Sequence, residues 1–234
     1  MYNIYNDKTY LNNNPTWHEE DAPLKTGKII ELLNRNNIHF NTVCDIGCGS
    51  GEILIQLANR LNNTVNMSGF DISKDAIAIA RRKETNRIKF EQRDVAETVE
   101  NYHFDLLLVI DVIEHIENYF RFLDKVASLG KYTIFHIPLD MCLWSLFQEK
   151  MLIESKERVG HIHNFTEAFI ESILMDKGFK IIDKLYTEPS FTNQTFKQKL
   201  INQFRKVLFK INKKLCTKTL GGYSILLLTE NPHW

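Results

Sequence analysis

Four aspartates lie at or near the ends of short apolar stretches of the chain, and their spacing could support chemistry. They are Asp45, Asp71, Asp94 and Asp111. If these stretches are parallel strands, their carboxyl ends meet at the edge of the sheet where open α/β proteins bind ligands. Carboxylates there can accept hydrogen bonds from ribose hydroxyls and from an adenine amino group. The spacing therefore predicts one shared site for a nucleoside-containing ligand.

A glycine-rich turn joins the first of these strands to a helix. In the stretch Val43–Ala58, which reads VCDIGCGSGEILIQLA, glycine occupies positions 47, 49 and 51. Such glycines let a ligand approach bare backbone beside the positive end of a helix. The dinucleotide fingerprint G-x-G-x-x-G is not met, because residue 52 is glutamate. A negative charge at the helix start disfavours a pyrophosphate and favours a ligand that carries an ammonium or sulfonium group.

Histidines supply the candidates for a general base that works near neutral pH. We rank His115 first, then His161 and then His136, with His163 last. A hydrogen-bonded loop or core histidine is the alternative for each of them, and many acceptors need no strong base. His161 and His163 could suggest a metal, but no motif places an acid or a third ligand beside them, so we expect no metal.

Apolar runs alternate with amphipathic stretches along the chain, as strands and helices do in an α/β fold. We expect strands at 43–46, 65–71, 87–94, 104–111, 131–139, 179–188 and 222–230. We expect helices over 24–33, 53–61, 75–83, 119–129, 143–157, 166–178 and 195–215, with Thr166 as an N-cap and Gly178 as a stop. This alternation predicts a parallel, doubly wound sheet.

The motifs, taken together, resemble those of class I S-adenosylmethionine-dependent methyltransferases of the small-molecule group. The matching pieces are VCDIGCGSG, GFDIS, FEQRDV, FDLLLVIDVIEHIEN, VGHIHNFT and GGYSILLLTE, in the expected order over residues 43–230. The resemblance implies a Rossmann-like sheet of seven strands, the last antiparallel and inserted between its neighbours, with helical cap insertions. It implies a single domain over residues 1–234, with a lid at 1–23 and substrate-side caps at 140–165 and 190–221.

The same resemblance implies roles for individual residues. Asp45 would hold the methionine part of S-adenosylmethionine, Asp71 the ribose, and Asp111 would lie beside the methionine amino group. His115 would face the substrate, and His18 would belong to the lid. The residues that complete this implied cofactor site are Gly47, Cys48 and Gly49 at the methionine part, and Ile72, Asp94 and Val95 at the adenine.

Composition narrows the function classes. The 234 residues carry 29 basic and 29 acidic side chains, so no global field argues for a nucleic-acid partner. Four cysteines without metal spacing fit reduced thiols in a cytosol. No apolar run approaches the length of a membrane span, and the N-terminal residues lack the features of a signal peptide. We therefore expect a cytoplasmic protein.

One segment departs from this neutral balance. Residues 191–221 contain eight lysines and arginines and no acidic residue, and apolar residues recur there at helical spacing. We favour a covering helix whose apolar stripe completes the domain. A cap that attracts an anionic substrate is a second hypothesis, peripheral contact with an anionic membrane is a third, and RNA is a fourth.

These observations predict an S-adenosylmethionine-dependent enzyme that methylates a small molecule at oxygen. The basic segment favours an anionic acceptor that bears a sugar or a phosphate, such as a precursor of a surface or capsule polysaccharide. A quinone or lipid precursor and an N-methyltransferase remain alternatives, and so does a non-catalytic cofactor-binding partner subunit. The sequence leaves the oligomeric state open.

Overall fold

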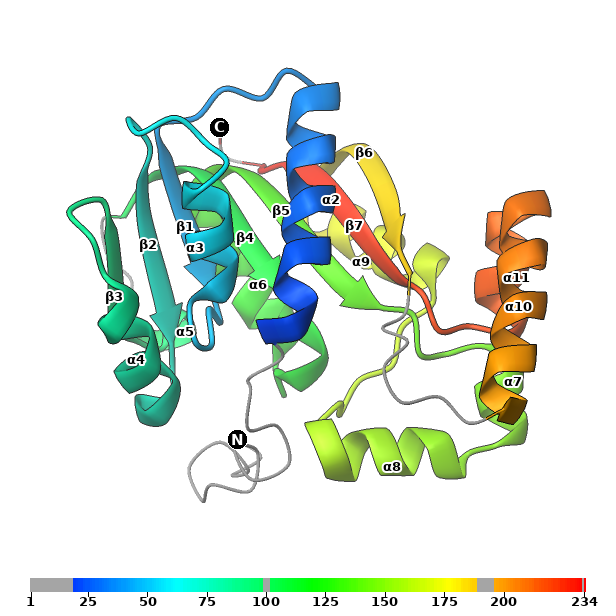
Figure 1. The fold of residues 1–234 in the computed structure, drawn as a ribbon. Helices are drawn as coiled ribbons and strands as arrows, with labels where there is room; N and C mark the ends of the chain where they lie inside the picture. Colours follow the sequence, from blue (N-terminus) through cyan, green and yellow to red (C-terminus); the bar gives the residue numbers. More distant parts are fainter. Residues whose placement is uncertain (1–18, 99–101, 189–195, 233) are drawn as a thin grey trace.

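Seven strands form one sheet in the order β3-β2-β1-β4-β5-β7-β6 (Figure 1). The computed structural model describes residues 19–98, 102–188, 196–232 and 234. The strands are β1 (Thr42–Ile46), β2 (Asn66–Asp71), β3 (Ile88–Gln92), β4 (Phe104–Ile110), β5 (Gly130–Pro138), β6 (Lys180–Thr187) and β7 (Ser224–Glu230). The pairs among β1 to β5 are parallel, and β7 runs antiparallel between β5 and β6. The Rossmann-like sheet with an inserted antiparallel last strand is confirmed.

Helices cover both faces of the sheet (Figure 1). One apolar core joins the sheet to α2 (Ala22–Arg35), α3 (Glu52–Ala58) and α4 (Lys74–Ala80), and the other joins it to α6 (Tyr119–Leu129) and α9 (Glu167–Asp176). Central β4 contributes to both cores, because Leu106 and Leu108 pack on one face while Leu107 and Val109 pack on the other. This explains why β4 is an unbroken apolar run.

Short helical elements lie between the main strands and helices. They are η2 (Glu19–Asp21), η3 (Arg81–Lys83), α5 (Val95–Thr98) and η4 (Ile113–His115). The expected caps are confirmed: the Thr166 hydroxyl accepts a hydrogen bond from the Phe169 amide at 3.3 Å, and Gly178 takes a left-handed φ of +83° after α9. Of the expected lid at 1–23, residues 1–18 lie outside the described part.

Two long helices expected from the sequence are each divided. Residues 143–157 form α7 (Leu143–Phe147) and α8 (Lys150–Val159), which are separated at Gln148. The basic segment forms α10 (Phe196–Ile211) and α11 (Lys213–Thr219), because the Asn212 side chain accepts from the Leu215 amide at 3.0 Å and starts a new helix. Neither single helix is therefore correct.

The apolar stripe of the basic segment is not wholly buried. Phe204 is 65% exposed and Ile211 is 77% exposed, while Cys216 on α11 is buried. The favoured expectation of a helix whose apolar stripe completes the core is therefore met only in part. The four cysteines are free and buried. In the described part of the chain, no helix combines the length and the apolar character that a membrane crossing needs.

Candidate active site

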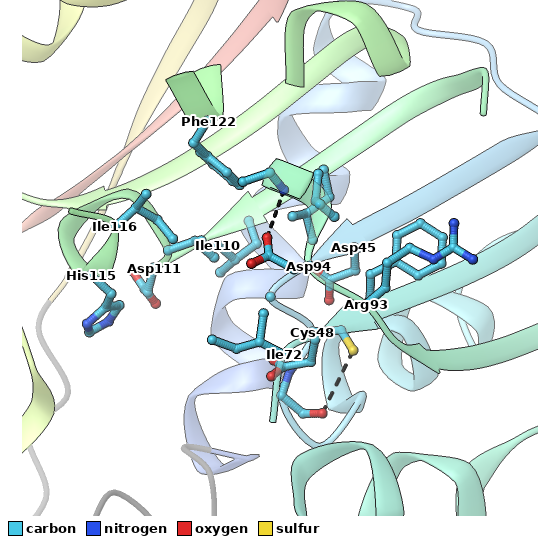
Figure 2. A pocket seen from close by; sticks show the side chains of 18 of the residues that line it. Asp45, Cys48, Ile72, Arg93, Asp94, Ile110, Asp111, His115, Ile116 and Phe122 are labelled. Carbon is cyan, nitrogen blue, oxygen red and sulfur yellow. Dashed lines mark hydrogen bonds between the residues drawn. The ribbon is translucent and has the colours of Figure 1, made fainter. Parts of the chain in front are cut away.

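A cavity of about 470 Å³ opens at the carboxyl ends of β1, β2, β3 and β4 (Figure 2). Nearly all the residues expected at a cofactor line it. They are Asp45, Gly47, Cys48, Gly49, Asp71, Ile72, Asp94, Val95 and Asp111. The expected lid residue His18 lies outside the described residues. The parallel strands thus bring together, at one edge of the sheet, groups that are spread over nearly seventy residues of sequence.

The glycine turn after β1 presents backbone to this cavity. Gly47, Gly49 and Gly51 all have positive φ angles, which favour glycine. The amides of Gly47 and Cys48 both donate to the Phe70 carbonyl, at 2.7 and 3.0 Å, and so fasten the turn to β2. A Cβ on Gly51 would lie 2.4 Å from the Phe90 ring, so the turn has no room for a side chain there. The turn is therefore fixed against β2 and presents backbone without side chains, as the close approach of a ligand requires.

Asp45 lies beneath this turn and is almost fully buried. Its Oδ1 atom has no hydrogen-bond partner among the described residues. Burial, and secondarily the charge of Asp71, raises the pKa of Asp45 to about 7. A buried carboxylate oxygen without a partner is costly, and a positively charged ligand group would compensate it. Asp45 therefore fits the cationic methionine part of S-adenosylmethionine.

Asp71 ends β2 and ties the second loop to the first. Its Oδ2 accepts from the Gly49 amide at 2.8 Å, and its Oδ1 accepts from the Ser73 amide at 2.7 Å. Burial raises the pKa of Asp71 although these amides act in the opposite direction. Each carboxylate oxygen retains a second lone pair, so both can also accept from ligand hydroxyls. The geometry fits a ribose with two adjacent hydroxyls.

The third wall of the cavity follows β3. Asp94 accepts a hydrogen bond from the Ala96 amide at 2.9 Å and caps α5, so it acts in loop capping as well as lining the cavity. Arg93 lies over the Tyr102 ring, 4.8 Å from its centroid, and also lines the cavity. Ile72 faces the same space from the end of β2 (Figure 2). An apolar side chain and a nearby carboxylate suit the flat ring and the amino edge of an adenine.

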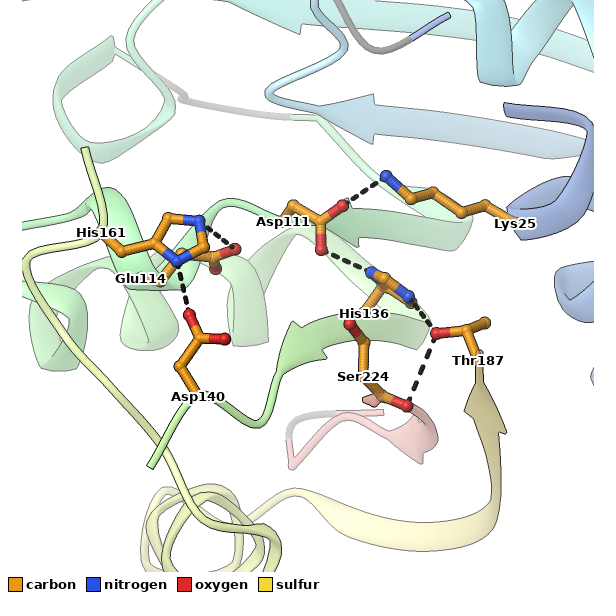
Figure 3. A network of polar contacts seen from close by, with 8 residues as sticks. All are labelled: Lys25, Asp111, Glu114, His136, Asp140, His161, Thr187 and Ser224. Carbon is orange, nitrogen blue, oxygen red and sulfur yellow. Dashed lines mark hydrogen bonds and ion pairs between the residues drawn. The ribbon is translucent and has the colours of Figure 1, made fainter. Parts of the chain in front are cut away.

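Asp111 anchors a network that sequence reasoning did not foresee (Figure 3). Its Oδ2 lies 2.7 Å from the Lys25 ammonium, and its Oδ1 lies 2.5 Å from Nδ1 of His136. Burial alone would raise the pKa of Asp111, but the neighbouring His136 and Lys25 hold it well below its usual value. Asp111 also has a φ of +55°, unusual for a residue other than glycine. The ionised Asp111 carboxylate already pairs with the Lys25 ammonium. It also fits a second amino group, that of the methionine part of S-adenosylmethionine.

The three favoured histidines have different surroundings. His115 lines the cavity, with Nδ1 3.0 Å from the Gly160 carbonyl. His161 lies beside it, with ring centroids 5.0 Å apart, and its Nδ1 is 2.7 Å from Asp140. His136 is only 3% exposed, and its Nε2 is bonded to the Thr187 hydroxyl at 2.6 Å. Because both of its nitrogens are engaged inside the protein, the geometry gives His136 a role in orienting Asp111 and does not support its expected role as a base.

Sequence reasoning missed Lys25, Glu114 and Asp140. Glu114 follows Asp111 by three residues within the quoted motif, yet the motif alone assigned it no role. It is fully buried, and burial raises its pKa well above the usual value. Lys25 and Asp140 carry no local signal, because each matters only through a contact made by the tertiary fold.

Known proteins share sequence and fold with this chain. A family model described as a methyltransferase domain matches residues 40–156. A ubiquinone biosynthesis O-methyltransferase of Rickettsia typhi is 25% identical over 101 residues, which are 41% of this chain and 41% of that protein. The match therefore spans about two-fifths of the curated relative's length.

Solved structures share the fold. A magnesium protoporphyrin IX methyltransferase of Synechocystis with bound S-adenosylhomocysteine has a TM-score of 0.60 and 20% identity, covering 94% of this chain and 86% of that one. An N-methyltransferase of Bradyrhizobium japonicum with the same ligand has a TM-score of 0.61 and 14% identity, covering 97% and 100%. The family match covers half of the sequence and includes the glycine turn and all four aspartates. The chain therefore belongs to the class I S-adenosylmethionine-dependent methyltransferases.

Proposed function

We propose that this chain transfers a methyl group from S-adenosylmethionine to a hydroxyl oxygen of a small molecule, and that the acceptor is a phenolic quinone precursor. The observation that carries the methyl-transfer step is the convergence of four aspartates and a bare glycine turn on one cavity. The curated relative from Rickettsia, an O-methyltransferase of ubiquinone biosynthesis, supports the acceptor class.

The reaction is an in-line displacement. When bound, S-adenosylmethionine supplies an electrophilic methyl group, and the acceptor oxygen forms the new C–O bond as the C–S bond breaks to give S-adenosylhomocysteine. In this proposal the chain's aspartates hold the cofactor while the cavity aligns the acceptor oxygen with the methyl carbon. His115 is the lining histidine among the three ranked candidates, and it would take the proton that leaves the acceptor hydroxyl.

Exposed apolar side chains support an acceptor with an apolar tail. Phe147 on α7 is 80% exposed, and Trp144, Phe204 and Val207 line a second groove of about 540 Å³ between α7 and α10. Contiguous exposed apolar surface marks sites that bind apolar ligands or partners. These helices lie together beside the β6 edge of the molecule (Figure 1).

An anionic acceptor bearing a sugar or a phosphate, such as a precursor of a surface polysaccharide, is the second candidate. The observation in its favour is the excess of lysine and arginine over residues 191–221. Among the described residues, however, no side chain of α10 or α11 lines the first cavity. The basic helices thus give this candidate less support than the sequence suggested.

A labelling experiment tests the proposal. The full chain is incubated with S-adenosylmethionine carrying a labelled methyl group and with one acceptor at a time: a catechol with an apolar tail, a sugar phosphate, and a primary amine. We expect label on an oxygen of the catechol. Label on the sugar phosphate or the amine instead would overturn the acceptor class, and cofactor binding without transfer to any acceptor would favour a non-catalytic subunit.

A further inference from the structure

Three side chains with metal-ligating atoms meet beside the first cavity, although one of them is distant in sequence. Glu114 and His115 come from η4, and His161 comes from the loop before α9. One ligand atom from each lies within 4.8 Å of the others. In contrast to the expectation of no metal drawn from the sequence, we propose that these three residues bind a divalent transition-metal ion.

Glu114 provides the first argument. Its side chain is 0% exposed, and neither carboxylate oxygen has a hydrogen-bond partner among the described residues. Both oxygens could therefore bind a metal ion on the side of His161, whose Nε2 lies 3.9 Å from Oε1 (Figure 3). A buried carboxylate in this situation is costly unless a cation compensates it. A metal ion between Glu114 and His161 would provide that compensation.

The orientation of the histidines provides the second argument. Metal-bound histidines usually donate their other ring N–H to a carboxylate or a backbone carbonyl. His161 has this arrangement, with Nδ1 2.7 Å from Asp140 and Nε2 toward Glu114. His115 has the corresponding arrangement with a backbone carbonyl, because its Nδ1 lies 3.0 Å from the oxygen of Gly160. Both rings are therefore held as metal ligands are held.

The backbone around the three residues is also fixed. The amides of Ile162 and His163 donate to the Glu114 carbonyl, at 2.9 and 3.1 Å. The His163 ring bonds the Ile116 carbonyl at 3.0 Å. These contacts fasten the loop that carries His161 to the element that carries Glu114. A metal would therefore meet ligands that are already positioned.

The donor set indicates the kind of metal. Two imidazole nitrogens and one carboxylate suit zinc, iron and related ions, whereas magnesium and calcium prefer oxygen ligands alone. Two ligands of one zinc ion lie roughly 3.3 Å apart, given bond lengths of about 2.0–2.2 Å. The 3.9 Å separation of Nε2 and Oε1 needs only a small closure to reach this value.

Three protein ligands leave an open coordination position for a substrate oxygen. Because His115 also lines the first cavity, that position would face the acceptor. His115 would then serve as a metal ligand in place of the proton-accepting role proposed above. The bound metal would lower the pKa of the acceptor hydroxyl, whose proton would pass to solvent before methyl transfer. This role, unlike the metal site itself, rests on the proposed function.

The test uses the untagged full chain after treatment with a chelator. Cobalt(II) is added as a spectroscopic probe and zinc is titrated by calorimetry. We expect one ion per chain, with visible cobalt absorption of a site that contains nitrogen ligands. His161→Ala and Glu114→Gln should each weaken binding at least about tenfold, and Asp140→Asn about 10–100-fold through the orientation of His161. His103→Ala, which removes an exposed imidazole elsewhere, is the matched control and should bind normally.

Two results would overturn the site. One is that the wild-type chain binds neither zinc nor cobalt. The other is that the metal affinity of the wild type equals that of Asp140→Asn and His161→Ala chains that keep the wild-type circular dichroism spectrum. Binding of S-adenosylmethionine to the metal-free chain is measured in parallel. If cofactor binds and no metal does, the metal proposal alone fails. If metal binds and no acceptor is methylated, the proposed function alone fails.

Discussion

Asp45 should release a proton when the cofactor binds. Its pKa is about 7 in the cofactor-free protein, because the carboxyl group is buried and close to Asp71. At about pH 6 it is therefore about nine-tenths protonated. The positive charges of S-adenosylmethionine favour the ionised form, so binding at this pH should expel about 0.9 proton per chain. The free cofactor's amino group, with a pKa of about 8, is already protonated there and contributes little.

Calorimetry in two buffers of different ionisation enthalpy measures this proton directly. The difference between the observed enthalpies, divided by the difference between the buffer enthalpies, equals the number of protons released. Asp45→Asn keeps the size of the side chain and removes its titration. We expect the release to fall by nearly one proton in this variant, and the wild-type affinity to fall about tenfold for each pH unit below 7. Equal proton release by wild type and Asp45→Asn would refute the assignment of Asp45 to the cationic part of the cofactor.

Further outcomes follow from other contacts. Asp71→Asn should weaken cofactor binding by about 1–3 kcal/mol through the loss of charge-assisted hydrogen bonds, whereas Asp124→Asn, at an exposed ion pair with Lys177, should leave calorimetric affinity unchanged. His136→Phe should lower the free energy of unfolding in urea by about 1–3 kcal/mol, since it removes the buried bonds to Asp111 and Thr187; no loss would contradict the structural role. Stability of the cofactor-free chain should fall as pH rises from about 4 to about 7, because the folded state keeps the Asp45 proton that the unfolded chain loses in this window. This part of the pH dependence should be absent in Asp45→Asn.

The cofactor side of the cavity could be predicted because its signals are local. A glycine turn between a strand and a helix, and an acid at or near the end of each neighbouring strand, are visible in short windows of sequence. The parallel sheet then brings the strand ends together without further information. For this reason Asp45, Asp71, Asp94 and Asp111 all line the cavity as expected.

Features that depend on contacts between distant segments were predicted less well. Lys25 meets Asp111 across 86 positions, and His136 meets Thr187 across 51. Neither the residues around His136 nor the spacing of apolar residues there shows that both of its ring nitrogens form hydrogen bonds inside the protein. The helix break at Gln148 carries no glycine or proline signal either. These features arise from tertiary packing, which local propensity does not encode.

The central claim is that the cavity at the strand ends binds S-adenosylmethionine through the four aspartates. A crystal structure of the full chain with S-adenosylhomocysteine tests it most directly. The account predicts the ribose hydroxyls on the Asp71 carboxylate, the adenine between Ile72 and Asp94, and the methionine part beside Asp45 and Asp111. Electron density for the ligand elsewhere, or in an orientation that leaves Asp71 without a ribose contact, would contradict it.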